Sequence, residues 1–240
     1  MRPPTENAAT NARTIAVIGG TGAEGGGLAL RFARAGARVR IGSRRLEKAQ
    51  EAARRVAASA GGGEVTGHTN PEAATGAKIV LLTVPLAAQV EILKSVRDSF
   101  QPGTILVDAT VPLEIAIGGR LSRTVTLWDG SAAQQAARLA PEGIRVVAAF
   151  HALSAEALSH LDRPVDCDTL LCGDDAEAKA AVSELAGLIP GVRAVDAGPL
   201  DNARLVESAA ALLISLNLRH KVRSSGVRIT GLERAQESHR

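Results

Sequence analysis

Residues 14–45 read TIAVIGGTGAEGGGLALRFARAGARVRIGSRR, and this stretch decides the fold. The apolar run at 14–18 predicts a buried strand, and a glycine-rich turn follows it. Apolar residues at helical spacing then predict a helix over 25–35, and a second strand is expected at 37–42. A strand, a glycine-rich turn, a helix and a second strand in this order indicate the first unit of a Rossmann-type sheet.

The rest of the chain repeats this alternation. The segment KIVLLT at 78–83 shows no alternation of polar and apolar residues, as is typical of a strand buried on both faces of a parallel sheet. Further strands are expected at 64–67, 104–108, 144–149, 168–172 and 192–196, and helices at 46–60, 71–76, 86–99, 131–140, 175–188 and 201–219. The pattern predicts an α/β fold: a doubly wound, Rossmann-type parallel sheet followed by a small C-terminal α/β subdomain.

Composition limits the classes of function. The chain has 240 residues, a formal charge of +3 and two cysteines, and it has no tyrosine. The mild positive charge suits anionic small ligands and does not by itself predict nucleic-acid binding. Two cysteines are too few for a zinc site, so no metal is expected. Without tyrosine, the Tyr-x-x-x-Lys pair of short-chain dehydrogenases cannot exist. We also expect no signal peptide or membrane span, and therefore a cytoplasmic protein.

The glycine-rich turn carries the clearest functional motif. Gly20, Gly22 and Gly25 form G-x-G-x-x-G between a buried strand and a helix. The first glycine permits a tight turn, the second lets the backbone approach a pyrophosphate, and the third lets the helix pack on the sheet. The alternative is a merely tight strand–helix connection.

The end of the second expected strand indicates which dinucleotide binds. An NAD-specific protein usually places an acid here for the ribose hydroxyls. This chain instead has Ser43, Arg44 and Arg45, with Lys48 one turn into the next helix. Guanidinium groups pair with a 2′-phosphate and stack on adenine, so these residues favour NADP. The alternative is a solvated basic start of a helix.

Two further places lie at the expected carboxyl edge of the sheet, where loops line the cofactor groove. Thr83, Val84 and Pro85 end the strand at 78–83, although the proline could simply terminate it. His151 follows the strand at 144–149. It could be a proton donor or a cofactor contact, or it could equally be an ordinary histidine at an interface.

Four stretches carry a resemblance to a known family: GGTGAEGGGLALRFARAG, GSRRLEKA, CGDDAEAKAAV and DAGPLDNARLVESAAALL. The sequence resembles NADPH-dependent reductases of coenzyme F420, an 8-hydroxy-5-deazaflavin, over roughly residues 14–215. The segment at 196–200 followed by 204–207 is the most specific part, because a generic Rossmann fold does not require it. The resemblance implies reversible hydride transfer between NADP and F420 by a homodimer.

The resemblance also assigns site residues. It implies that Thr21 contacts phosphate, that Ser43, Arg44 and Lys48 hold the 2′-phosphate, and that Thr83 lies at the cofactor. The deazaflavin ring would stack on the nicotinamide beside the segment from His151 to Ala155, which includes Leu153. Other residues implied to lie near the ring are Gly198, Pro199, Leu200, Arg204 and Ser208.

Other readings stay open from the sequence. The same platform could reduce another flavin or pterin-like acceptor, or the chain could be a non-catalytic NADP-binding sensor or subunit. The basic segment from Arg219 onward could attract an anionic part of the deazaflavin coenzyme or be a solvated terminus.

We expect four parts along the chain. They are a flexible arm at 1–13, an NADP-binding Rossmann domain at 14–150, an acceptor-binding subdomain at 151–230 and a flexible tail at 231–240. The expected partners are small molecules and a second copy of the chain, with neither nucleic acid nor membrane.

Overall fold

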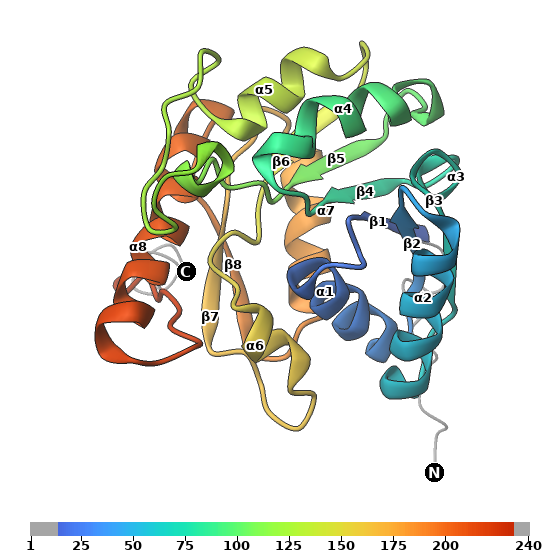
Figure 1. Cartoon of the computed structure of the whole chain (residues 1–240), viewed down its shortest axis with the longest axis horizontal. Coiled ribbons are helices and arrows are strands. Elements are labelled where there is room, and N and C mark those ends of the chain that lie inside the picture. The colour runs from blue at the N-terminus through green and yellow to red at the C-terminus, as the bar shows by residue number, and fades with distance from the viewer. Residues whose placement is uncertain (1–13, 233–240) are drawn as a thin grey trace, which may run out of the picture.

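The computed structural model describes residues 14–232, and within them a single parallel sheet organises the N-terminal part (Figure 1). Its six strands run in the order β3-β2-β1-β4-β5-β6. This reversal of direction at β1 and β4 is the doubly wound arrangement, so the predicted fold class is confirmed. The strands are β1 (Thr14–Ile18), β2 (Arg38–Ser43), β3 (Val65–Thr69), β4 (Ile79–Leu82), β5 (Ile105–Asp108) and β6 (Arg145–Ala148).

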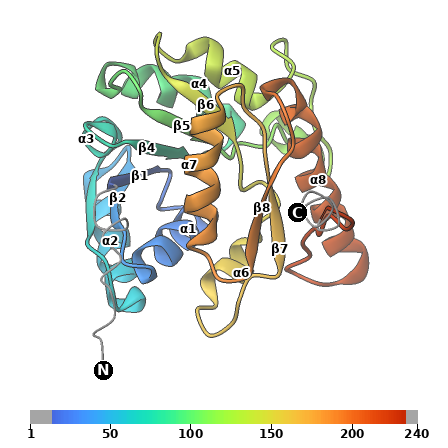
Figure 2. The ribbon, with the colours of Figure 1, turned by 180° about the vertical axis from the view of Figure 1, so that it is seen from behind.

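Helices cover both faces of this sheet because its strands are apolar on both sides. Alternate residues of β1 enter two separate cores: Ile15 and Val17 face one, and Ala16 and Ile18 face the other. The first core is covered by α1 (Ala23–Arg34), α2 (Leu46–Ala60) and α7 (Ala176–Gly187), as Figure 2 shows for α7. The second is covered by α3 (Asn70–Ala74), α4 (Leu86–Val96) and α5 (Ala132–Leu139).

The C-terminal part adds a two-stranded parallel sheet of β7 (Cys167–Leu171) and β8 (Val192–Asp196). An antiparallel bridge between Ala148 and Cys172 joins it to the end of β6. Residues of both parts share the first core, so the expected boundary at 150 stays a prediction. The remaining elements are α6 (Ala155–Ser159), α8 (Ala203–His220) and the 3₁₀ turns η2 (Arg97–Ser99), η3 (Glu114–Ile117) and η4 (Leu200–Asn202).

Helix α6 was not predicted from the sequence, and it links the two parts. Arg31 of α1 is 3% exposed, and its guanidinium donates hydrogen bonds to four carbonyl oxygens at distances between 2.5 and 3.1 Å. These oxygens belong to Ala157, Leu158, His160 and Arg163. A helix of five residues has too few turns to show a periodic pattern of apolar residues in the sequence.

Helix α8 buries a different face from the one that its leucines suggest. The buried side is made of Ala203, Val206, Glu207, Ala210 and Ala211. The leucines at 205, 212 and 218 are instead 59–63% exposed. Small residues face inward because α8 packs closely on α5, where the Glu207 carboxylate accepts hydrogen bonds from the backbone N–H groups of Ala132 and Ala133, both at 3.0 Å. The face that carries Leu205, Leu212 and Leu216, here the leucine face, is uncovered in a single chain.

The ends of the chain fall mostly outside the described residues. The arm expected at 1–13 lies outside them, and of the tail expected at 231–240 only the first two residues are described. Within residues 14–232, no helix combines the length and the apolar character that crossing a membrane requires. The two cysteines are free and buried, on opposite sides of β7.

Candidate functional site

Two adjoining hollows lie at the carboxyl ends of the strands. We call them the basic groove and the central cavity, with volumes of about 450 and 600 Å³. They share Gly22 of the glycine loop and the segment Thr83–Pro85 after β4. The basic groove is lined by Gly19, Thr21, Gly22, Ser43, Arg44, Arg45, Lys48, Asn70, Thr83, Val84, Pro85, Ala88 and Ile92.

The glycine loop is held against the end of β4. Gly19 has a φ of +85°, which side chains disfavour, and a Cβ atom there would lie 2.5 Å from the carbonyl oxygen of Thr83. A Cβ atom on Gly25 would lie 2.3 Å from Oγ1 of Thr83, whose hydroxyl donates to the carbonyl oxygen of Ile18 at 3.0 Å. Helix α1 therefore approaches the sheet at a distance that only glycine allows. Gly20 lies in the turn itself, where its N–H donates to Val17 at 3.2 Å.

The start of α1 is open for an anion. Its N-cap is Gly22, which has no side chain to occupy the first N–H groups. Unpaired N–H groups and the helix dipole together favour a bound phosphate at such a helix end.

The cations predicted at the end of β2 lie around the same groove. Arg44, Arg45 and Lys48 are exposed, and no ion pair involving them is found within residues 14–232. The Ser43 hydroxyl oxygen accepts a hydrogen bond from the backbone N–H of Arg45 at 3.2 Å, which shapes the turn into α2. The structure thus brings the glycine loop and the basic residues together.

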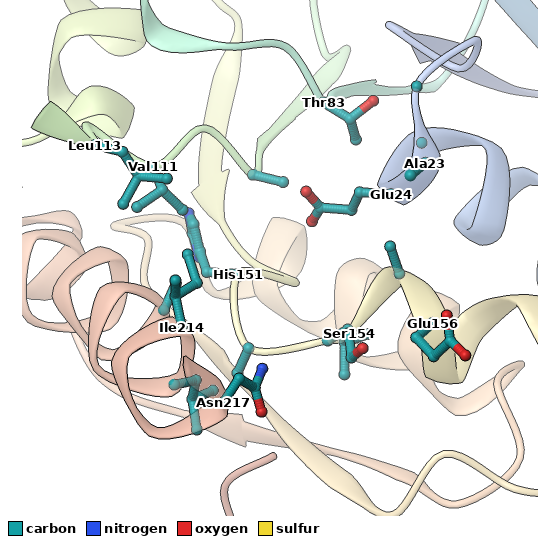
Figure 3. A pocket seen from close by; sticks show the side chains of 18 of the residues that line it. Ala23, Glu24, Thr83, Val111, Leu113, His151, Ser154, Glu156, Ile214 and Asn217 are labelled. Carbon is teal, nitrogen blue, oxygen red and sulfur yellow. The ribbon is translucent and has the colours of Figure 1, made fainter. Parts of the chain in front are cut away.

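The central cavity continues from the groove toward the C-terminal part (Figure 3). Its wall combines apolar residues from the segment after β5, including Val111, Leu113 and Ile115, with Leu213 and Ile214 of α8. The other lining residues are Gly22, Ala23, Glu24, Gly25, Thr83, Val84, Pro85, Ala109, His151, Ala152, Leu153, Ser154, Ala155, Glu156, Ala210, Asn217, Arg223 and Ser225. A mostly apolar wall with a few polar groups suits a flat heterocyclic ring.

His151 enters this cavity from a strained backbone. The preceding residue, Phe150, has a φ of +72°, a rare conformation for a bulky side chain. The Phe150 ring packs edge-to-face on Phe32, and the Phe150 N–H donates to Oγ1 of Thr169 at 2.9 Å. These tertiary contacts stabilise the strained backbone conformation. Both ring nitrogens of His151 are buried without a partner among the described residues, and burial lowers its pKa to about 4. A neutral imidazole therefore offers one donor and one acceptor to a ligand.

Two acids with buried carboxyl oxygens, Asp108 and Glu24, lie at the cavity, and no motif in the sequence predicted a role for either of them. Asp108 ends β5 and accepts hydrogen bonds from Nε2 of Gln89 at 2.6 Å and from the N–H of Thr110 at 2.8 Å. Burial nevertheless raises its pKa to about 7. Glu24 lies in the first turn of α1, and burial, helped by Asp108, raises its pKa to about 8. Its position inside the glycine motif was the available signal, since an acid there faces the ligand.

Glu24 should make stability depend on pH. Its folded pKa lies above the unfolded value of 4.5, so the native state keeps a proton that the unfolded chain loses as pH rises from about 4.5 to 8. The free energy of unfolding should therefore fall over this range, and Glu24 should contribute about 1–2 kcal/mol of that fall, because its partial exposure to solvent weakens the effect. Thermal unfolding of the wild type and Glu24→Gln from pH 5 to 8 should show a smaller decline in the variant, and parallel curves would contradict the assignment.

The basic C-terminal residues are partly incorporated into the fold. Residues 222–230, here the C-terminal strap, run along β7, where the N–H of Asp168 donates to Val227 at 2.7 Å. Arg193 and Arg228 both hydrogen-bond the buried Asp168, and although burial opposes its ionisation, these bonds and the N–H of Ile229 hold its pKa at about 2. The strap brings Arg223 and Ser225 to the cavity wall, so part of the basic segment lies beside the site, and its contact with the coenzyme stays a prediction.

Five residues assigned by resemblance line neither hollow. Gly198, Pro199 and Leu200 form the turn after β8, which is tied to residues 173–174 by hydrogen bonds from Gly173 to Gly198 and from Leu200 to the Asp174 carboxylate. Arg204 and Ser208 are exposed on α8, where the Ser208 hydroxyl donates a hydrogen bond to the backbone carbonyl oxygen of Arg204 at 2.7 Å. Their part in binding stays a prediction. By contrast, Thr21, Ser43, Arg44, Arg45, Lys48, Thr83, Val84, Pro85, His151, Leu153 and Ala155 all line one or both hollows.

Comparison with known proteins gives the family. A family model described as NADP oxidoreductase, coenzyme F420-dependent, matches residues 14–112. An F420-dependent NADP reductase from Methanothermobacter thermautotrophicus is 52% identical over 221 residues, which cover 91% of this chain and 95% of the relative. The chain belongs to the F420-dependent NADP reductase family. A second such reductase, from Methanocaldococcus jannaschii, is 41% identical over 223 residues, covering 91% of this chain and 99% of the relative.

Solved structures agree with this assignment to the F420-dependent NADP reductases. A crystal structure from Arthrobacter sp. FB24, provisionally described as a reductase of this family, has a TM-score of 0.75 and 25% identity, covering 90% of this chain and 99% of that one. A reductive aminase from Aspergillus terreus in complex with NADPH has a TM-score of 0.58 at 16% identity, covering 88% of this chain and 63% of that chain, and supports the fold alone.

Proposed function

We infer that the protein transfers a hydride between NADP(H) and coenzyme F420. The observation that carries this inference is the continuity of the basic groove with the apolar central cavity across Gly22 and Thr83–Pro85, in a chain of this family. One ligand can lie in each hollow, and their reactive ends can meet at the shared wall. The relatives favour F420 over another flavin or pterin-like acceptor and over a non-catalytic sensor.

The groove fits NADP on several counts. Gly25 lets α1 approach Thr83 at a distance that a Cβ atom would forbid, and the start of α1 offers N–H groups for a pyrophosphate. Arg44 and Lys48 would pair with the 2′-phosphate, with Ser43 and Arg45 at the same turn and Thr21 at the phosphates. NADP, when bound, supplies the hydride chemistry.

The protein's own task is alignment and exclusion of water. The apolar wall formed by Val111, Leu113 and Ile214 would hold a deazaflavin ring against the shared segment Thr83–Pro85. The neutral His151 can orient the ring through a hydrogen bond. Holding two reactive groups in contact in a dry site is itself a large source of rate enhancement.

His151→Ala should therefore lower the rate only modestly, by less than about tenfold, because no acid–base step with its usual factor of about 10²–10⁴ is assigned to this imidazole. The measurement is kcat for F420 reduction beside the Kd for NADPH. Complete loss of turnover with NADPH binding intact would contradict this role and make His151 indispensable.

We also propose that the protein forms a homodimer through the uncovered leucine face of α8. Leu205, Leu212 and Leu216 lie exposed along it at helical spacing, and exposed apolar patches commonly mark protein interfaces. Sedimentation equilibrium should give twice the mass of the chain, and Leu212→Glu should shift the protein toward monomer. A monomeric wild type would contradict the proposal.

A cytoplasmic location is proposed as well, because phosphorylated coenzymes are used inside the cell and both thiols are free. Fractionation of the native host, followed with an antibody, tests this location. Recovery in the membrane or secreted fraction would contradict it.

A further inference from the structure

Glu24 has a buried carboxyl oxygen, and its side chain makes no hydrogen bond or salt bridge with the described residues that would explain its position. It stands in the first turn of α1, and its carboxyl group points into the central cavity, on the side that faces His151 (Figure 3). The residue as a whole is half-buried, but its Oε1 is fully buried and lacks a hydrogen-bond partner among residues 14–232. A buried polar atom that lines a cavity and has no hydrogen-bond partner in the described part of the protein indicates a group that a ligand completes.

The groups around Glu24 supply no positive charge. Asp108 faces it from the end of β5, and Glu207 of α8 lies beyond Asp108 and interacts with it. The neutral His151 stands across the cavity after β6. The other charged residues on the cavity wall, Glu156 and Arg223, are both exposed to solvent, and the described residues include no salt bridge to Glu24.

These surroundings keep Glu24 protonated near neutral pH. Burial is the larger cause of its raised pKa, and the neighbouring Asp108 is the smaller one. The positive end of α1 acts in the opposite direction, but a pyrophosphate bound at the same helix end would offset it. The reduced nicotinamide ring is uncharged and does not change the protonation of Glu24, whereas the oxidised ring carries a positive charge.

We propose that Glu24 is a redox-coupled proton carrier, which keeps its proton while NADPH is bound and releases it when NADP⁺ is bound. This proposal rests on the proposed function, because it places the nicotinamide end of the cofactor at the wall that the two hollows share. A positive charge a few ångströms from a buried carboxyl group stabilises the carboxylate.

The proton and electron balance agrees with this role. Reduction of F420 by NADPH moves one hydride, which carries two electrons and one proton, and consumes one further proton. Glu24 supplies that second proton: its O–H bond breaks as the hydride moves from the cofactor to a ring carbon of the deazaflavin, and an N–H bond forms at a nitrogen of the same deazaflavin ring. The carboxylate that remains faces the oxidised, cationic nicotinamide. Exchange of NADP⁺ for NADPH removes the positive charge, and Glu24 then takes a proton from solvent. In the reverse direction each step runs backward.

The test measures protons released on binding, with no acceptor present. The whole protein at pH 7.5, in weak buffer with a pH-indicator dye, is mixed with saturating NADP⁺ or NADPH. We expect NADP⁺ to release about half a proton or more per site, because a nearby unit charge lowers a buried carboxyl pKa by about one to two pH units. NADPH should release almost none. Protons from the 2′-phosphate are common to both nucleotides and cancel in the difference.

Two variants make the assignment specific. Glu24→Gln keeps the size and polarity of the side chain and should abolish the difference between the nucleotides. Glu156→Gln, an exposed acid on the same cavity wall, should leave the difference unchanged. Equal proton release by both nucleotides in the wild type, or an undiminished difference in Glu24→Gln, overturns the proposal. Failure of either nucleotide to bind would instead contradict the proposed function.

A second measurement needs no variant. Because proton release and affinity are linked, the Kd for NADP⁺ should fall relative to the Kd for NADPH by up to about tenfold per pH unit as the pH rises from about 6 to 8. Titration of the 2′-phosphate affects both nucleotides alike and leaves this ratio unchanged. A constant ratio of the two Kd values across this range overturns the proposal even if Glu24→Gln does not fold.

Discussion

Replacing Arg44 and Lys48 together by alanine should raise the KM for NADPH by about 100-fold and change the KM for NADH by less than about threefold. The two nucleotides differ only in the 2′-phosphate, and both cations lie at the basic groove without an ion pair in the described part of the chain. A hydrogen bond to a charged group contributes about 1.5–3 kcal/mol, and each 1.4 kcal/mol is a factor of ten, so two such bonds account for this effect.

A matched control removes the same charge from α2, the helix that follows Arg44 and contains Lys48. Arg54 and Arg55 of α2 are exposed and line neither hollow. The Arg54→Ala, Arg55→Ala double variant should keep the NADPH preference of the wild type, apart from a small effect of net charge that salt suppresses. Equal losses for NADPH and NADH in the Arg44, Lys48 variant would show that these cations do not read the 2′-phosphate.

Gly25→Ala should cost at least about 100-fold in NADPH affinity. The new Cβ atom would lie 2.3 Å from Oγ1 of Thr83 and 2.8 Å from the carbonyl oxygen of Gly19. Neither neighbour can yield alone, because the Thr83 hydroxyl is bonded to Ile18 and Gly19 is in the turn itself. The loop must therefore move away from β4, and a misplacement of about 1 Å in a positioned site costs roughly 10²-fold.

Gly187→Ala serves as the comparison, since a Cβ atom there meets nothing within 4 Å. It ends α7, far along the chain from the glycine loop, and should leave NADPH binding unchanged. Circular dichroism and thermal unfolding of both variants separate a local effect from a loss of fold. Wild-type affinity in a folded Gly25→Ala protein would mean that the loop does not cradle the pyrophosphate.

The doubly wound sheet could be predicted from the sequence because each βα unit has its own local pattern of apolar residues and turn residues. The run IVLL at 79–82 is apolar throughout, and the structure buries every one of these residues in β4. Helix α2 and strand β8 begin and end at the predicted residues or within one of them. The glycine loop and the cations after β2 were likewise found because the groups that bind a dinucleotide are close together in sequence.

Features built from distant segments could not be predicted in the same way. The C-terminal strap pairs with β7 some sixty residues earlier, through backbone groups and the Asp168 carboxylate. Helix α6 depends on the guanidinium of Arg31, which lies about 130 residues before it. The turn at 198–200 was placed at the acceptor by resemblance, yet it lines neither hollow, because residues 173–174 hold it.

The raised pKa of Glu24 also follows from the fold and not from the motif. The sequence shows an acid in the first turn of α1, where an ordinary exposed glutamate would be ionised and stabilised by the helix dipole. Only the approach of Asp108 at the end of β5 and the burial of the carboxyl oxygen reverse that expectation.

Spectrophotometric turnover of F420 tests the central claim most directly. Purified protein, NADPH and oxidised F420 are mixed, and the loss of deazaflavin absorption is followed, with NADH in place of NADPH in one arm and a free flavin in place of F420 in another. Fast bleaching with NADPH and F420, but not in the other two arms, is the predicted result. No bleaching by a protein that still binds NADPH would contradict hydride transfer to F420.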